Sequence, residues 1–349
     1  MNLKTIQTKL SALFFPVIAF FLPAIASAHE VYVLNSSEVS HDVSLPPLNL
    51  FSVAVENGQQ FLLIAFLAIL GVVCILGISV SRKLENLLDP ILLKIKPYAP
   101  YISQVTIGLA VLASAYYGAL FGTELPFTHL FGSYAHLVAI LLYISAFSFL
   151  FGVYARIGGF ITMIIYIAAI FSGPGIYMIS YMTYLGTSIF MIILGGGYNL
   201  FDFGESIGFH QHKIISYLRE RKYFIIRIFF STSLIYSALY AKLIHGQLAL
   251  DTVNKYHLTD YFHFSPAFVV LGAFIVEIVV GLFYLLGFEV RFASLLFLTF
   301  LTMSLCFFGE SVWPHLILIG TALSMLVHGY DEYSIERRWY LKGIKEPVF

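Results

Sequence analysis

Nine apolar segments run through the chain, and each is about long enough to cross a lipid bilayer as a helix. A bilayer core of roughly 30 Å needs about 20 apolar residues of α-helix. The sequence is 59% hydrophobic and 11% charged, whereas soluble domains hold about 25% charged residues. Lipid must cover the excess apolar surface, so we expect an all-α polytopic membrane protein with nine transmembrane helices. The segments are residues 58–81, 102–122, 134–152, 156–172, 176–196, 223–245, 266–286, 290–307 and 311–328.

Net charge and cysteine content exclude several classes of protein. The formal net charge is zero, which gives no indication of a nucleic-acid partner. The two cysteines, Cys74 and Cys306, lie in apolar segments, and no Cys-x-x-Cys pair occurs. This argues against a disulfide scaffold and against a membrane thiol oxidoreductase of the paired-cysteine type.

The N-terminus has the organisation of a secretory signal peptide. Two lysines precede an apolar run at 10–22, and residues 26–28 read Ala-Ser-Ala, a small-x-small cleavage pattern. We therefore predict a signal peptide at 1–28. Cleavage would make His29 the first residue of an extracytoplasmic segment, 29–57, which precedes the transmembrane helix at 58–82.

The distribution of Lys and Arg predicts the orientation. With the mature N-terminus outside, only Lys242 and Lys255 fall on the outer side. Two more lysines belong to the signal peptide, and the remaining fifteen of the nineteen basic residues fall inside. Because basic residues accumulate on the cytoplasmic side, we expect a multi-pass protein of the bacterial inner (cytoplasmic) membrane whose tail, 331–349, is cytoplasmic.

Two stretches of the chain resemble each other. Residues 148–160 (SFLFGVYARIGGF) and 282–294 (LFYLLGFEVRFAS) each carry a Gly, three further residues and an Arg. The strings ASAYYGAL and YSALYAKL match in the same way upstream. We therefore expect 101–200 and 223–330 to be two copies of a four-helix membrane repeat, related by an axis along the membrane normal.

Ionisable residues inside the apolar segments are the main candidates for a site. Glu277 lies near the middle of its segment, where a charge is costly and needs a partner. Arg227, Lys242 and His245 fall on one face of the segment 223–245 when plotted at about 100° per residue. We predict Glu277, Arg227 and Lys242 as catalytic residues and His245 as cofactor-binding. A second interpretation is structural: the two cations reach the membrane surfaces, and a neutral Glu277 bonds a neighbouring helix.

Most of the eleven histidines fall on the outer side of the predicted topology. Histidine is the commonest metal ligand, and an N-terminal His29 would offer an amino group and an imidazole, a chelate that suits copper. His257 and His263 could add ligands. The amphipathic ring also favours membrane interfaces without any metal, so both interpretations agree with the sequence.

The second copy resembles a known membrane family. Its strings IIRIFFSTSLIYSALYAKL (225–243) and AFIVEIVVGLFYLLGFEVR (273–291) are similar to the DoxX-like family, which includes the DoxD-type subunit of thiosulfate:quinone oxidoreductases. The resemblance covers about 105 residues well. It implies a four-helix membrane bundle associated with redox or quinone-linked processes, and it adds Arg291 to the candidate cofactor-binding residues.

Three functions are consistent with these features. The first is a redox-associated membrane subunit that passes electrons from a periplasmic donor or partner subunit to quinone. The second is an extracytoplasmic copper-handling protein that uses the outer histidines. The third is a non-catalytic transporter or scaffold, although the second copy alone keeps an acid at the position of Glu277, where the first has Leu142.

Overall fold

The computed structural model describes residues 34, 36–81, 83–195, 213–308 and 312–339, and this part of the chain is helical, with no β-strand. Seven of its helices are long and apolar enough to cross a membrane, and two shorter apolar helices, Ala155–Phe171 and Trp313–His328, lie at the other two expected positions. The expected all-α polytopic fold is therefore confirmed. The predicted signal peptide and His29 fall outside the described residues.

The first half is built from four principal helices joined by short elements. A 3₁₀ turn, η3 (Gly175–Tyr181), leads into the last of them. The four are α7 (Ala99–Tyr117), α9 (Ala135–Phe151), α10 (Ala155–Phe171) and α11 (Met182–Leu194), and the short helix α8 (Phe127–Phe131) lies between α7 and α9.

The second half repeats this order, with two short helices between its first pair of spans. Its first helix continues into a π-helical turn, η5 (Leu239–Ile244), and a 3₁₀ turn, η6 (Trp313–His315), precedes its last helix. The helices are α13 (Lys213–Glu220), α14 (Lys222–Ala238), α15 (Gly246–Lys255), α16 (Thr259–Phe262), α17 (Pro266–Leu286), α18 (Val290–Phe308), α19 (Leu316–His328) and α20 (Ile335–Trp339).

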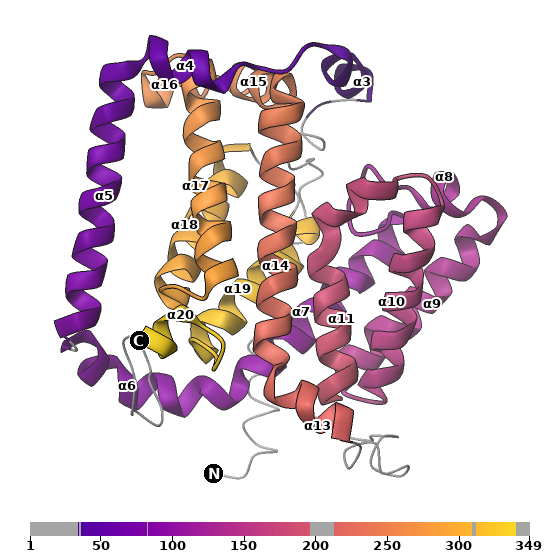
Figure 1. Ribbon diagram of the computed structural model, residues 1–349. Coiled ribbons are helices and arrows are strands. Elements are labelled where there is room, and N and C mark those ends of the chain that lie inside the picture. The colour runs from indigo at the N-terminus through magenta and orange to yellow at the C-terminus, as the bar shows by residue number, and fades with distance from the viewer. Residues whose placement is uncertain (1–33, 35, 82, 196–212, 309–311, 340–349) are drawn as a thin grey trace.

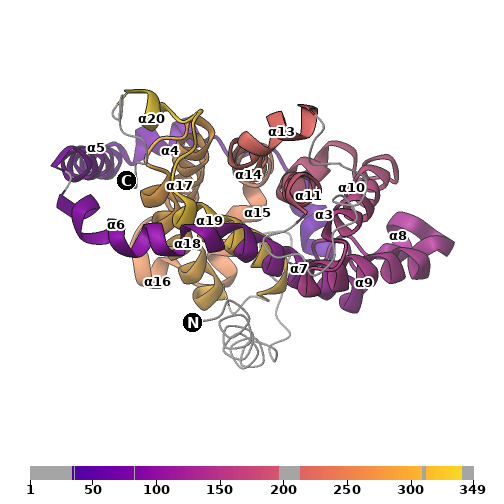
Figure 2. The same cartoon turned by 90° about the horizontal axis from the view of Figure 1, so that it is seen from below.

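The segment that precedes the two halves lies alongside the second half. It forms α3 (Ser36–Ser44), α4 (Leu50–Glu56), α5 (Gly58–Ser81), α6 (Lys83–Ile95) and the 3₁₀ turn η1 (Lys96–Tyr98). Figure 1 shows α5 beside the bundle, connected by α4 at one end and by α6 at the other. We call the end with α3, α4 and α15 the apical end, and the end with α6, α13 and α20 the basal end. Figure 2 shows α6 running across the basal end toward α7.

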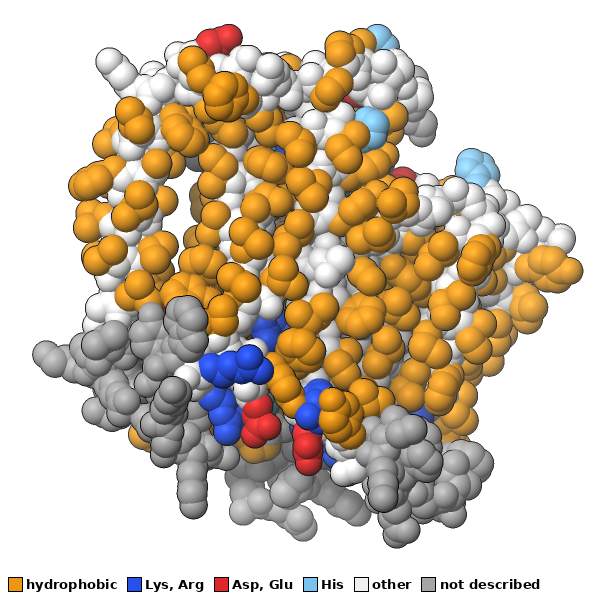
Figure 3. Space-filling model, viewed as in Figure 1, with side chains coloured by type: hydrophobic (Ala, Val, Ile, Leu, Met, Phe, Trp, Pro, Cys, Tyr) orange, Lys and Arg blue, Asp and Glu red, His pale blue; other side chains and the backbone are white. Residues whose placement is uncertain are grey.

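The outer surface has the character of a lipid-facing protein. Apolar side chains cover the face in Figure 3 between the two ends, and the visible Lys, Arg, Asp and Glu side chains gather mostly toward the basal end. The most apolar window of α5 has no buried residue. Because such a surface is unfavourable in water, these helices need a bilayer around them.

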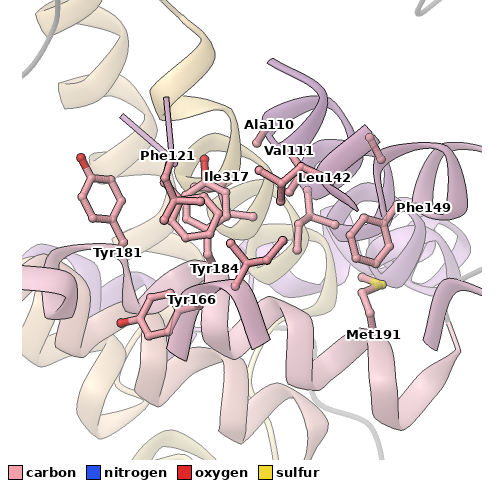
Figure 4. Close-up of a cluster of buried hydrophobic side chains, with 14 of the residues drawn as sticks. Ala110, Val111, Phe121, Leu142, Phe149, Tyr166, Tyr181, Tyr184, Met191 and Ile317 are labelled. Atoms are coloured by element: carbon pink, nitrogen blue, oxygen red, sulfur yellow. The ribbon is translucent and has the colours of Figure 1, made fainter. Parts of the chain in front are cut away.

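A dense core fills the first half. Its buried residues come mainly from α7, α9, α10 and α11, and Tyr223 and Ile226 of α14 and Ile317 of α19 join them from the second half. Phe121, in the loop after α7, is fully buried, and its ring stacks 3.9 Å from that of Tyr184 (Figure 4). The cores of the two halves are therefore in direct contact.

The two halves share backbone details that their sequences alone show only weakly. The α9–α10 turn has positive φ at Gly152 (63°) and Tyr154 (53°), and the α17–α18 turn has positive φ at Gly287 (64°) and Glu289 (46°). α7 packs on α19, and α14 packs on α11. The first helix of each half thus contacts the last helix of the other, which is the pattern of a two-fold interface. These matches support the proposal that 101–200 and 223–330 are two copies of one unit.

Candidate functional site

A cavity of about 440 Å³ lies between the two halves. Its walls come from η3 and α11 on one side and from α14, η5, α15, α17, α18 and η6–α19 on the other, and Ile64 of α5 contributes to the lining. The wall is mainly apolar, with aromatic side chains such as Phe268, Phe297 and Phe300. Small-molecule sites commonly have volumes of about 300–1,000 Å³, with few polar groups that orient the ligand.

An ion pair lies in the wall of this cavity. Lys242 Nζ is 3.1 Å from Glu277 Oε2, and the two side chains are only 4% and 15% exposed. The structure therefore brings these two predicted residues into direct contact. A buried charge needs such a partner because its desolvation is costly.

The π-helical turn positions Lys242. The backbone of His245 donates to the carbonyl of Tyr240, five residues earlier, with a distance of 2.9 Å. A π-turn adds one residue to the helical turn, so it changes the direction of the side chains that follow. A helical wheel that assumes a regular α-helix therefore does not describe the apical part of this segment.

Arg227, the third predicted catalytic residue, lies elsewhere. Its Nε is 2.8 Å from Asp331 Oδ2, and its guanidinium also donates to the carbonyls of Tyr284 and Leu285. Glu277 lies seven residues before Tyr284, which corresponds to roughly 10 Å along α17. The structure thus separates Arg227 from Glu277, and a catalytic role for Arg227 stays a prediction. The partner of Arg227 was not predicted, because Asp331 falls in the segment expected to be a cytoplasmic tail.

A second polar group in the cavity comes from the first half. Tyr177 and Tyr181 line the cavity, and both hydroxyls donate to Oε1 of Glu124; the distance from Tyr177 is 3.2 Å. Tyr177 also packs on Tyr240 across the boundary between the halves, with ring centroids 5.0 Å apart. This group was not predicted from the sequence. The string GTELP, which places an acid at 124 directly after a transmembrane segment, was the available indication.

The predicted cofactor and metal residues are scattered. His245 contacts the ring of Tyr240 at 4.7 Å. Arg291 is buried against Gly329 at the basal end, and is therefore remote from the apical histidines. His257 and His263 are exposed, in turns where both residues have positive φ.

A copper site is not visible in the described part of the chain. Among the described residues, no group of three or more His, Cys, Asp or Glu side chains is placed to hold a metal ion. His29 lies outside them, so its role as a chelate stays a prediction. By contrast, His315 is 2% exposed and lines the cavity.

The family of the second half follows from comparison with known proteins. Residues 223–310 match the DoxX family model. The chain carries a DoxX domain. The domain covers α14 through α18, so it contains Arg227, Lys242 and Glu277, and the DoxX-like resemblance of the sequence is confirmed. The first half of the chain and η6–α19 lie outside the matched residues.

The DoxX domain supplies one wall of the cavity. Its ion pair faces side chains such as Tyr181 and His315, which lie outside the matched residues. Comparison of the chain with curated proteins and with solved structures gives no match. The site is therefore interpreted from its own geometry.

Proposed function

We propose that this DoxX-domain membrane protein binds a lipid-soluble molecule with a polar head in the cavity between its halves, and that it acts as a redox-associated, quinone-linked membrane subunit. The observation that supports the proposal is the Lys242–Glu277 ion pair in the wall of an apolar cavity of about 440 Å³. The combination of apolar walls and a few convergent polar groups is typical of a ligand site.

The residues present fit a quinone. The aromatic and aliphatic walls suit a flat ring with an apolar chain, and the ammonium of Lys242 is a hydrogen-bond donor that suits a carbonyl oxygen. A bound quinone supplies two-electron, two-proton redox chemistry. Electrons would come from a periplasmic donor or a partner subunit.

Each polar residue has a distinct role in this proposal. Lys242 orients the polar head by donating a hydrogen bond, and Glu277 holds Lys242 in place and can accept or return a proton. Glu124, with Tyr177 and Tyr181, provides a second proton-bearing group on the opposite half. The apolar walls exclude water, which strengthens these polar interactions.

Fluorescence of Trp313 provides a direct test. Trp313 precedes the cavity residues Pro314 and His315, and its ring stacks on Tyr117 at 5.3 Å. In the full chain carrying Trp339→Phe, which removes the other tryptophan, decylubiquinone should quench this fluorescence with a saturable curve. Lys242→Met and Glu277→Gln should each weaken binding at least about tenfold, because each removes one member of the polar pair.

A matched control uses an ion pair outside the cavity. Lys255 Nζ lies 2.8 Å from Glu38 Oε2 at the apical end, and these side chains are 40% and 37% exposed. Lys255→Gln should bind decylubiquinone like the parent chain. Linear, unsaturable quenching, or equal affinity in the Lys242 and Lys255 variants, would overturn the proposal and favour a scaffold or transporter.

A further inference from the structure

The cavity between the halves is closed where it borders the first half. Thr183 and Tyr184, on α11, are each 1% exposed, and Ile317, on α19, is 2% exposed. Tyr184 and Ile317 also belong to the dense core of the first half. Close-packed side chains leave no path through such a core, so a ligand must reach the cavity from another side.

Four lining residues of the cavity are exposed, and all four are apolar. They are 37–45% exposed: Ile64 of α5, Phe264 before α17, and Met303 and Phe307 of α18. We call these four residues the portal. All of them lie toward the apical end, where α5 and α17 begin and to which α18 returns after its turn with α17 (Figure 1). Exposed apolar groups that continue into a cavity are typical of a membrane or ligand contact, so the portal connects the cavity with the bilayer.

A groove on the surface of α18 continues from the portal. Met303 and Phe307 line both the cavity and this groove, which extends back along the helix to Leu295. The distance from Leu295 to Phe307 along an α-helix is roughly 18 Å. The hydroxyl of Thr302, in the groove, donates to the carbonyl of Leu298, so this polar group is already bonded within the helix. The groove therefore offers an apolar surface that leads away from the cavity.

The polar and apolar parts of this surface suit the two parts of one molecule. The ion pair of Lys242 and Glu277 lies in the wall of the cavity and can contact a polar head. The portal and the groove offer only apolar surface to whatever leaves the cavity beside them. A hydrocarbon tail attached to that head would pass through the portal and stay out of water.

We propose that the portal and the groove on α18 bind the apolar tail of the quinone whose head occupies the cavity, and that the quinone enters here from the bilayer. This inference rests on the proposed function, and it adds a tail-binding site and a route of entry. A cavity of about 440 Å³ has the size expected for a small molecule. The tail beyond the portal therefore lies along α18, among lipid.

Photo-cross-linking tests where the tail lies. The full-length protein, in phosphatidylcholine nanodiscs, carries p-benzoylphenylalanine in place of Ile64 or of Met303 and is illuminated with decylubiquinone. Mass spectrometry should show a quinone adduct whose yield saturates as the quinone concentration rises. The control carries the same photoreactive group in place of Ile69, which is 64% exposed on α5 and is not a lining residue of the cavity. Its adduct should be several-fold weaker and should not saturate.

Fluorescence of Trp313 provides a second measurement. In the protein carrying Trp339→Phe, the further change Ile64→Asn places a polar amide at the portal. It should weaken the binding of decylubiquinone several-fold and leave the binding of the tail-free ring, dimethoxy-methyl-benzoquinone, unchanged. The matched change Ile69→Asn, on the same helix, should affect neither ligand.

The outcomes separate this inference from the proposed function. Absence of saturable quenching by decylubiquinone would overturn both. Saturable quenching with equal adducts at positions 64, 303 and 69 would overturn only the tail site, as would an equal loss of affinity for both ligands in the Ile64→Asn protein. Adducts with phosphatidylcholine that decylubiquinone does not displace would show that a lipid acyl chain occupies the portal, which also contradicts the inference.

Discussion

Arg227 and Asp331 form an ion pair that closes the basal end of the second half. Arg227 Nε lies 2.8 Å from Asp331 Oδ2, the side chains are 2% and 8% exposed, and 104 residues separate them along the chain. Arg227 also donates to the last carbonyls of α17, and Asp331 Oδ1 accepts from the backbone of Tyr333. The pair therefore links the first helix of the DoxX domain to the end of α17 and to the segment after α19.

Removing the acid of this pair should destabilise the protein strongly. Asp331→Ala leaves the Arg227 guanidinium buried without its carboxylate, a change that costs about 3–5 kcal/mol in comparable buried pairs. We expect a clear fall in the thermal unfolding midpoint measured by circular dichroism. Glu332→Gln is the control, because Glu332 is 60% exposed and its contact with Arg337 is 3.4 Å. Similar midpoints for the two variants would contradict a structural role for Asp331.

Substitutions in the cavity ion pair should affect folding stability and ligand binding differently. Lys242→Met or Glu277→Gln alone leaves one buried group without its partner, so each should lower the unfolding midpoint. The double variant Lys242→Met/Glu277→Met replaces both groups with apolar side chains and should recover much of the stability. It should still bind decylubiquinone at least about tenfold more weakly than the parent chain. Full recovery of binding would show that the polar pair has only a structural role.

Two glycines at the interface between the halves should be important for the stability of the fold. A Cβ at Gly186 would collide with Phe229, and a Cβ at Gly320 would collide with Thr106, in both cases across a contact between the first helix of one half and the last helix of the other. Gly186→Ala and Gly320→Ala should each destabilise the fold by about 1–3 kcal/mol through overpacking.

The control for these glycines is in α5. A Cβ added at Gly71 would meet no atom of a neighbouring element within 4 Å, so Gly71→Ala should leave the unfolding midpoint unchanged or slightly raised, given the higher helix propensity of alanine. A Gly320→Ala chain as stable as Gly71→Ala would show that the halves do not pack as described.

The apical helix α3 should be held more firmly at low pH. The pKa of the Asp42 carboxyl is raised by burial first and then by the nearby carboxylate of Asp251, and Glu38 adds to this, whereas His41 opposes it. Because the folded state binds this proton more tightly, the contribution to stability is complete below the unfolded pKa of about 3.9. It is lost as the pH rises through the raised folded value.

This dependence can be measured as the change in unfolding midpoint between pH 4.5 and pH 7. Asp42→Asn should reduce the fall in midpoint over this interval, since an amide carries no titrating proton. Glu38→Gln removes a different apical acid, which pairs with Lys255, and serves as the comparison. If Asp42→Asn leaves the pH dependence unchanged, the carboxyl pair does not control the attachment of α3.

Much of the fold follows from the sequence. Apolar segments of bilayer length must become helices, because unpaired backbone groups cannot be left in lipid. For this reason the positions of the nine apolar helices could be predicted to within a few residues. Glu277 could also be recognised from the sequence alone, because an acid within an apolar segment needs a partner wherever the helix packs.

Contacts between segments depend on the tertiary structure. The pairing of Arg227 with Asp331 joins residues 104 positions apart, and no local pattern specifies that the chain after α19 turns back under α14. The π-turn at Leu239–Ile244 changes the direction of the residues that follow, so a regular wheel could not place Lys242 against Glu277.

The sequence by itself determined that this chain forms membrane helices, because hydrophobicity and helix length are local properties that water and lipid act on directly. Which charges meet was decided only by the packing of the helices against one another. That packing places Glu277 beside Lys242 and Asp331 beside Arg227. It also places Glu124 against Tyr177 and Tyr181, which line the cavity. Buried charges are stable only beside a partner, and the position of that partner is a property of the assembled fold.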